Sequence, residues 1–238
     1  MVKIKLFILG NIRYCINYER LFKWHSSFFS ISGPNTLQIL PETDMPLWTY
    51  SDEKINTVLK EDRNFDIVLG VINSRIEDNY YMRRIADNKV ILSLYETLEV
   101  LNKLELSVED FILKNIYEIV LIHLKCGNIP ETAYQIAHED FRSCLFDLNY
   151  DKMDIYHSLH KPQLCDACYA YFLETVPKED VDNVLNELKR IKKPLFISMK
   201  EWIKKHPIIS LVLAFTTAIL ANFVTEWIKV ILRWMINL

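Results

Sequence analysis

The feature that most constrains the fold is an uncharged stretch near the C-terminal end. Residues 208–225 read IISLVLAFTTAILANFVT and contain no charged side chain. A helix of about 20 apolar residues is long enough to cross roughly 30 Å of bilayer hydrocarbon. The alternative is a buried core helix, but apolar residues on every side of a helix suit lipid better than a globular surface. The stretch therefore predicts a C-terminal transmembrane helix.

The flanking charges predict the orientation of this helix. Basic residues are concentrated before it, whereas only Lys229 and Arg233 follow it. Because basic residues next to a span remain on the cytoplasmic side, we expect a single-pass protein of the inner (cytoplasmic) membrane with its N-terminal body in the cytoplasm. The preceding basic residues are Lys189, Arg190, Lys192, Lys193, Lys200, Lys204 and Lys205.

The segments around the span have separate expected roles. Residues 174–206 are expected to form a basic juxtamembrane helical stalk, which is either solvated, with a break at Pro194, or bound to anionic headgroups. Residues 207–238 hold the transmembrane helix and a tail in which Trp227 and Trp234 suit headgroup depth. The tail either continues the helix or lies along the surface. The lipid bilayer is thus a predicted partner.

The body, residues 1–173, has the pattern of an α/β (α+β) domain. Hydrophobic residues make up 50% of the chain, which is enough for a sizeable core. Apolar strands alternate with helical segments, an order typical of a mostly parallel or mixed sheet with packed helices. The predicted strands are 3–9, 65–72 and 88–95, and the predicted helices are 51–61 and 107–125. The last helix is expected to be largely buried, with a capping box at Ser107 and Asp110 and an end at Gly127.

A pattern of metal ligands follows that helix. His138, Cys144, Cys165 and Cys168 supply one imidazole and three thiols, and the last two cysteines form a C-x-x-C turn. Zinc prefers four such ligands in a tetrahedron, and four protein ligands leave no open position. The pattern therefore predicts a structural zinc site within residues 138–168. The alternative is a set of ordinary core cysteines.

The identity of the fourth ligand stays open in the sequence. Cys126 is an alternative to His138, and His157 and His160 lie in the loop between the cysteines. The N-terminal MVKIKLFILG is typical of a strand and not of a signal peptide, so reducing cytosol is expected, where clustered cysteines more often bind metal than form disulfides. Cys15 has no motif around it and is expected in the core.

The stretch 138–173 resembles the cysteine-rich tail of archaemetzincin-type zincins. That tail has a Cys-x-Met-Asn-like element, then a Phe-Cys-x-x-Cys that closes the chain onto a structural zinc. Here CLFD (144–147) and LCDAC (164–168) stand in that order at similar spacing. The resemblance covers roughly 65–173 and implies a zincin-like fold with the structural zinc kept. It does not imply a protease.

The catalytic motif of that family, His-Glu-x-x-His, is degenerate in this chain. The family carries it on the buried helix before the tail, where the best match is YEIVL (117–121). Glu118 matches the motif glutamate, but Tyr117 and Leu121 stand where both zinc-binding histidines should be. The HEDFR that begins at His138 has an arginine at the second histidine position, and arginine cannot bind zinc at neutral pH. No catalytic residue is therefore predicted.

Two classes of function follow from these observations. The first is a membrane-anchored, non-catalytic zinc-binding module that acts as a bacterial sensor or effector. This is an analogy of architecture with effectors, anti-phage ones included, that perturb the membrane after self-association or contact with a protein partner. The second is a membrane-tethered zinc metallohydrolase, a protease, with an unusual site. The degenerate motif favours the first class, and a net charge of −3 does not favour a nucleic-acid partner.

Overall fold

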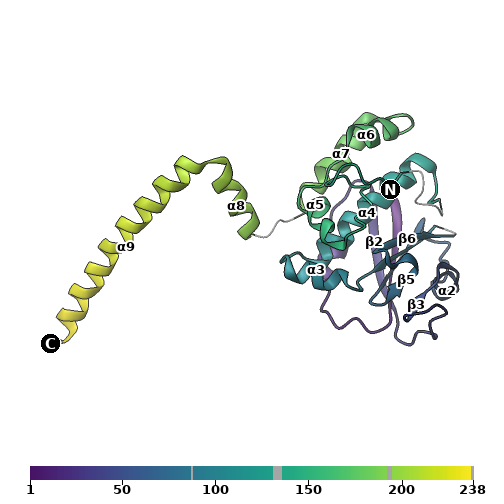
Figure 1. Ribbon diagram of the computed structural model, residues 1–238, viewed down its shortest axis with the longest axis horizontal. Coiled ribbons are helices and arrows are strands. Elements are labelled where there is room, and N and C mark those ends of the chain that lie inside the picture. The colour runs from purple at the N-terminus through teal and green to yellow at the C-terminus, as the bar shows by residue number, and fades with distance from the viewer. Residues whose placement is uncertain (87, 131–135, 192–194, 237–238) are drawn as a thin grey trace. The chain divides into compact units, whose positions relative to one another are not determined.

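The computed structural model describes residues 1–86, 88–130, 136–191 and 195–236, in two compact units, Met1–Lys192 and Lys193–Leu238 (Figure 1). The elements of the first unit are β1 (Val2–Leu9), α1 (Tyr18–Phe22), β2 (Phe29–Leu37), β3 (Thr49–Tyr50), α2 (Asp52–Val58), β4 (Ile67–Ile72), β5 (Arg75–Ile76), η1 (Glu77–Asn79), β6 (Met82–Ile85), β7 (Lys89–Ser93), α3 (Thr97–Lys103), α4 (Val108–Cys126), η3 (Lys152–Asp154), α5 (Ile155–His160), α6 (Asp166–Leu173) and α7 (Lys178–Leu188). The second unit contains α8 (Leu195–Lys205) and α9 (Pro207–Ile236).

A five-stranded sheet in the order β2-β1-β4-β7-β6 forms the centre of the first unit. β1 pairs in parallel with β2 and β4, and β4 pairs in parallel with β7, whereas β6 runs antiparallel to β7. The prediction of a mixed sheet with packed helices is confirmed. β6 is an edge strand, because no described strand pairs with its outer side.

Two hydrophobic layers cover the two faces of the sheet. On one face, Ile4 and Leu69 belong to the large core that also contains most of α4. On the other face, Leu59 at the end of α2 packs with Ile91 in a smaller core. A Cβ atom at Gly70 would lie 2.8 Å from Ile91 Cδ1 and 3.3 Å from Leu59 Cδ1. Glycine at this position therefore allows α2 to approach the sheet closely.

Helix α4 is the central helix of the large core. The Ser107 side chain accepts a hydrogen bond from the backbone N–H of Asp110, and Gly127 ends the helix with a left-handed φ of 73°. The predicted start and end of this helix are therefore confirmed. The Asp110 carboxylate also forms an ion pair with Arg20 of α1, which attaches α1 to the first turn of α4.

Helix α7 packs against α4 within the first unit, although its residues belong to the segment expected to form the stalk. Glu187 on α7 accepts hydrogen bonds from the Tyr117 hydroxyl and from the Ser27 backbone N–H, both at 2.8 Å. The expectation of a buried Cys15 is wrong: this residue is exposed. It lies between β1 and α1, outside both elements, and so belongs to neither of the layers that form the core.

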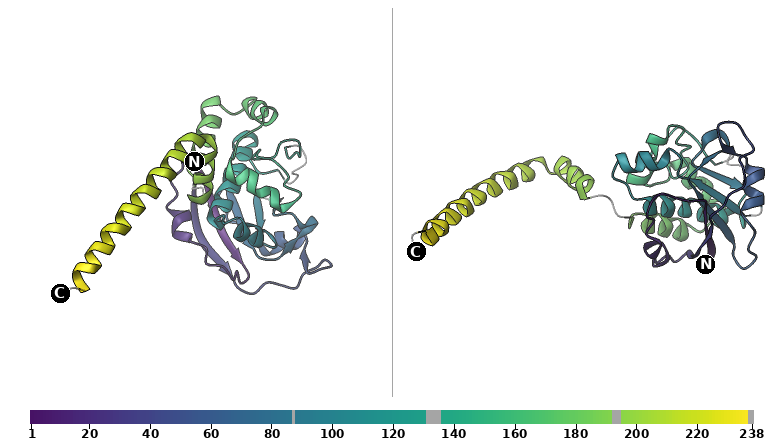
Figure 2. Two further views of the ribbon diagram at one scale, coloured as in Figure 1. Left: turned by 60° about the vertical axis from the view of Figure 1, so that its left-hand side comes forward. Right: turned by 90° about the horizontal axis from the view of Figure 1, so that it is seen from below.

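The second unit consists of α8 and the long α9, which meet at a bend (Figure 2). α9 contains the whole uncharged stretch 208–225. Among the described residues, no single helix has the length and apolarity of a membrane span. Two helical segments reach that length and apolarity only when they are taken together, namely Ser198–Lys205 and Pro207–Asn222. The two segments are bent by 109° at the break between them. The predicted break at Pro194 lies outside the described residues, and so do the side chains of Trp227 and Trp234.

Candidate zinc site and adjacent cleft

Short backbone pairings bring the four predicted zinc ligands together. His138 forms a bridge with Asp147, and Cys144 forms one with Gln163. The backbone N–H of Leu145 donates to the Gln163 carbonyl at 2.7 Å. These pairings return the chain to Cys144 after the intervening loop, immediately before the C-x-x-C turn.

Cys165 and Cys168 lie at the start of α6. Cys165 is the N-cap residue, and its sulfur accepts a hydrogen bond from the Cys168 backbone N–H at 3.4 Å. The backbone N–H of Cys165 donates to the Cys144 sulfur at 3.5 Å. Hydrogen bonds to ligand sulfurs orient them and stabilise their thiolate form. The first turn of α6 therefore prepares two sulfurs to bind a cation.

The four side chains converge on one point. The ligand atoms of His138, Cys144, Cys165 and Cys168 all lie within 4.8 Å of one another, and the Cys165 sulfur is 3.4 Å from His138 Nε2. Tetrahedral zinc with Zn–S bonds of about 2.3 Å separates its ligand sulfurs by about 3.8 Å. The spacing and the donor types both fit zinc, so these residues form the candidate zinc site.

Hydrogen bonds to the cysteine sulfurs favour the thiolate form at this site. The hydrogen bond from the Cys168 thiol lowers the pKa of Cys144 to about 5, and the same contact raises the pKa of Cys168. The hydrogen-bonded pair of sulfurs therefore favours the loss of one proton between them. Zinc binds thiolates, so its uptake has to release the remaining thiol protons.

The alternative ligands considered from the sequence lie elsewhere. Cys126 is exposed at the end of α4. His157 and His160 are on α5, where their rings contact the ring of Tyr156. Within the described part of the chain, none of the three belongs to the converging group of ligands.

Glu118, in the stretch of α4 compared above with the zincin motif, belongs to a buried ion pair. Lys114 Nζ lies 2.8 Å from Glu118 Oε2, one helical turn away, with the two side chains only 2% and 8% exposed. Lys114 also donates to the Leu145 carbonyl at 3.2 Å. Burial raises the pKa of Glu118, and the Lys114 ammonium opposes that rise. The residue that matches the motif glutamate thus has a fixed internal cation as its partner.

The residues at the two histidine positions belong to the core. Leu121 is fully buried, and Tyr117 is buried with its hydroxyl bonded to Trp24 and Glu187. Among the described residues, His138 and the three cysteines form the one group of three or more potential ligands that converges. Glu139, next to His138, is exposed, as expected for a solvated loop carboxylate.

A cleft of about 920 Å³ lies beside the ion pair. Its lining includes edge strand β6, Asp52 at the start of α2, Glu118 of α4 and residues 146–148 of the zinc-binding element. Arg83 of β6 makes a two-point ion pair with Asp52, at 2.7 and 2.6 Å. An open strand edge along a cleft can accept an extended polypeptide by strand addition.

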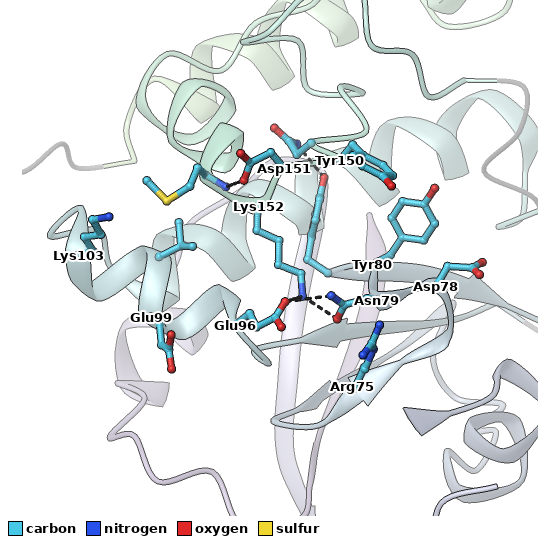
Figure 3. A pocket seen from close by; sticks show the side chains of 14 residues that line it. Arg75, Asp78, Asn79, Tyr80, Glu96, Glu99, Lys103, Tyr150, Asp151 and Lys152 are labelled. Carbon is cyan, nitrogen blue, oxygen red and sulfur yellow. Dashed lines mark hydrogen bonds and ion pairs between the residues drawn. The ribbon is translucent and has the colours of Figure 1, made fainter. Parts of the chain in front are cut away.

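A second cavity, of about 590 Å³, adjoins the cleft at Tyr81, which lines both. Figure 3 shows Lys152 extended toward Asn79 and Glu96, to which its Nζ is bonded at 3.1 and 3.2 Å. Asn79 and Glu96 have left-handed φ angles of 57° and 59°. Residues other than glycine keep such angles only where surrounding contacts hold them. Lys152 is one of the contacts that hold these two residues in place, and burial lowers the pKa of its ammonium group.

Lys114 and both cavities were not predicted from the sequence. A signal for Lys114 exists, because a lysine four residues before a glutamate on an apolar helix is placed to meet it. The cavities form between loops and an edge strand that are distant in sequence, and no local pattern encodes them.

Comparisons with known proteins bear on the fold. No family model and no curated protein matches the sequence. The chain is similar to the solved structure of archaemetzincin from Methanopyrus kandleri, with a TM-score of 0.50 and 12% identity over 73% of this chain and 94% of that chain. It is also similar to a zinc-dependent peptidase from Methanocorpusculum labreanum, with a TM-score of 0.42 and 15% identity over 71% and 99% of the two chains. The similarity to the first of these structures shows that this chain has a zincin-like fold.

Proposed function

We propose that this chain is a non-catalytic zinc-binding module of zincin-like fold that is attached to a bilayer and acts as a sensor or effector. The observation that carries the proposal is the Lys114–Glu118 ion pair. Resemblance to zincins implies that a catalytic zinc would be bound on this helix, but the Glu118 carboxylate already has a buried ammonium 2.8 Å away. Separating a buried pair leaves an uncompensated charge and costs about 3–5 kcal/mol. The pair therefore resists replacement by a metal.

The zinc at the candidate site has a structural role in this proposal. Its four protein ligands complete a tetrahedron and leave no position for water or substrate. They join the segment around His138 and Cys144 to the first turn of α6, so the energy of zinc binding contributes to folding. The cleft between this element and β6 remains available for a ligand, for which a polypeptide segment is the chemistry that the strand edge supports.

Bilayer attachment is supported by the exposed apolar side chains of α9. Ile208, Leu213 and Ile219 are 77%, 47% and 54% exposed. Continuous exposed apolar surface is typical of contact with lipid or with another protein. The proposed location is the cytoplasmic membrane, with the first unit in the cytoplasm. One helix cannot line a pore, so an effector that permeabilises the membrane in this way would have to self-associate.

The second candidate is a membrane-tethered zinc hydrolase. It is favoured by the retained cleft, because Glu118 still lines it next to an open strand edge. In this alternative, a metal would displace Lys114 from Glu118 when substrate binds.

Zinc stoichiometry of the purified full chain separates the two candidates. The non-catalytic module should contain about one zinc per chain. That content should not change when Lys114→Met and Glu118→Leu are made together, because the double change removes both charges of the buried pair, and any cellular phenotype should stay intact. A second, exchangeable zinc, with peptide cleavage that the same double change abolishes while the chain stays folded, would instead establish the hydrolase.

A further inference from the structure

We infer that α8 is an interfacial helix that binds the surface of an anionic phospholipid bilayer while α9 inserts into it. The inference rests on the proposed membrane attachment and extends it, because it names the lipid chemistry that the chain contacts. It is carried by the apolar face of α8, by its lysines and by its angle to α9.

The apolar face of α8 includes Met199, Trp202 and Ile203. Their spacing of three and four residues puts them on one side of the helix. The exposed fractions of these three residues are 60%, 43% and 47%, so α9 does not cover this face of α8. A tryptophan beside aliphatic side chains suits the boundary between headgroups and acyl chains. This face therefore matches the depth at which an in-plane helix lies.

The lysines of α8 favour a bilayer with negatively charged headgroups. Lys200 and Lys204 are one turn apart, Lys205 follows, and all three are exposed. The sequence of α8 contains these three lysines and one glutamate, so its net charge is +2. A basic helix face next to an apolar one complements negatively charged headgroups. An anionic bilayer satisfies both faces at once, whereas a neutral bilayer satisfies only the apolar one.

The junction of the two helices fits this arrangement. Ser198–Lys205 and Pro207–Asn222 meet at 109°, and α9 starts at Pro207, a residue suited to the first position of a helix. When α9 runs along the bilayer normal, a helix at this angle lies close to the membrane plane. The Trp202 ring contacts the His206 ring at the junction, with 5.6 Å between centroids, and so supports the bend.

The test uses the full chain reconstituted into vesicles of phosphatidylcholine alone or of phosphatidylcholine mixed with phosphatidylglycerol. An environment-sensitive nitrobenzoxadiazole label is attached at Ile203→Cys on the apolar face, with Lys204→Cys on the basic face as the matched control. The exposed Cys15 and Cys126 are first changed to serine so that they do not react. Flotation of the vesicles reports attachment of the chain separately from the position of α8.

In mixed vesicles the label at residue 203 should report apolar surroundings and the label at residue 204 should report water. Each lysine near an anionic surface strengthens binding about fivefold, so replacing Lys200, Lys204 and Lys205 by glutamine should lower the ratio of bound to free α8 roughly a hundredfold. Flotation should not change, because α9 still holds the chain.

Two results would overturn the inference and leave the membrane attachment standing. One is a chain that floats while its label at residue 203 reports water in mixed vesicles. The other is a label at residue 203 that reports equally apolar surroundings in neutral vesicles. A full chain that floats with neither kind of vesicle would overturn the attachment itself, and the inference with it.

Discussion

Tyr117 on α4 donates a 2.8 Å hydrogen bond to Glu187 on α7, although the two residues are 70 positions apart in sequence. The Trp24 indole N–H donates to the same hydroxyl at 2.7 Å. Tyr117 therefore holds three distant segments of the first unit together. Tyr117 therefore stabilises the fold at the position where the sequence comparison with the zincin motif expects a metal ligand.

Tyr117→Phe is expected to lower the free energy of unfolding by about 1–3 kcal/mol, because Trp24 and Glu187 lose a buried hydrogen-bond partner. Tyr150→Phe is the matched control, since Tyr150 is 79% exposed. The control should change stability by less than about 0.5 kcal/mol. Urea unfolding of the full chain in mild detergent measures both, and equal effects would contradict this role for Tyr117.

Glu187 should contribute to the acid dependence of stability. Burial tends to raise its pKa, but hydrogen bonds from Ser26, Ser27 and Tyr117 outweigh burial and lower it. A carboxyl with a lowered folded-state pKa stabilises the fold above its unfolded pKa, about 4.3, and this contribution is lost as pH falls through the folded value. Between about pH 5 and pH 3, unfolding free energy should therefore decline less steeply in Glu187→Gln than in wild type. If the unfolding free energies of wild type and Glu187→Gln declined equally over this acid range, the proposed contribution of Glu187 would be refuted.

The Lys114–Glu118 pair should show strong coupling. Lys114→Met leaves Glu118 as a buried, uncompensated charge and should destabilise the chain by about 3–5 kcal/mol. Adding Glu118→Leu removes that charge and should recover most of the loss. Denaturation of the two single variants and the double variant completes the cycle. A double variant as unstable as the sum of the single changes would mean that the two residues act independently.

Zinc should be required for folding of the first unit. Cys168→Ser removes a buried ligand, so the chain should lose its zinc and become insoluble or sensitive to protease. Cys126→Ser is the control, because Cys126 is exposed and outside the cluster. Metal content per chain and the soluble fraction are measured together. Soluble, fully folded wild-type protein without metal would rule out a structural zinc.

The bilayer attachment should depend on the middle of α9. Wild-type protein should stay in the membrane fraction in carbonate and in high salt, which would screen attachment by the lysines alone. Changing both Leu213 and Ile219 to lysine should release the chain, since each central lysine costs about 2.5–3.5 kcal/mol on insertion scales. Lysines at the exposed Ile39 and Leu47 of the first unit are the control and should release nothing. Wild-type protein that washes off in salt would disprove a spanning helix.

Local patterns explain most of what the sequence predicted. The start of α4 at Ser107 and its end at Gly127 follow from capping chemistry that acts within a few residues. The four candidate zinc ligands were identifiable because zinc requires particular atoms at particular spacings, and the structure brings their ligand atoms together. The antiparallel β6 was not predicted, because its sequence, MRRI, is short and half charged. The attachment of α7 through Glu187 depends on a partner far away in sequence, so no local signal reveals it.

The edge strand β6 also bears on how the protein behaves when concentrated. A free sheet edge can pair with the same edge of another molecule and start a fibril. In β6, Arg83 and Arg84 are consecutive, and neighbouring side chains of a strand point to opposite faces of the sheet. Two copies that approached edge to edge would therefore have to pack the Arg83–Asp52 ion pair and the buried Arg84 of each copy beside those of the other. Charged side chains on an edge strand are one means by which proteins avoid such pairing, so the strand that borders the cleft also opposes assembly of the protein into sheets.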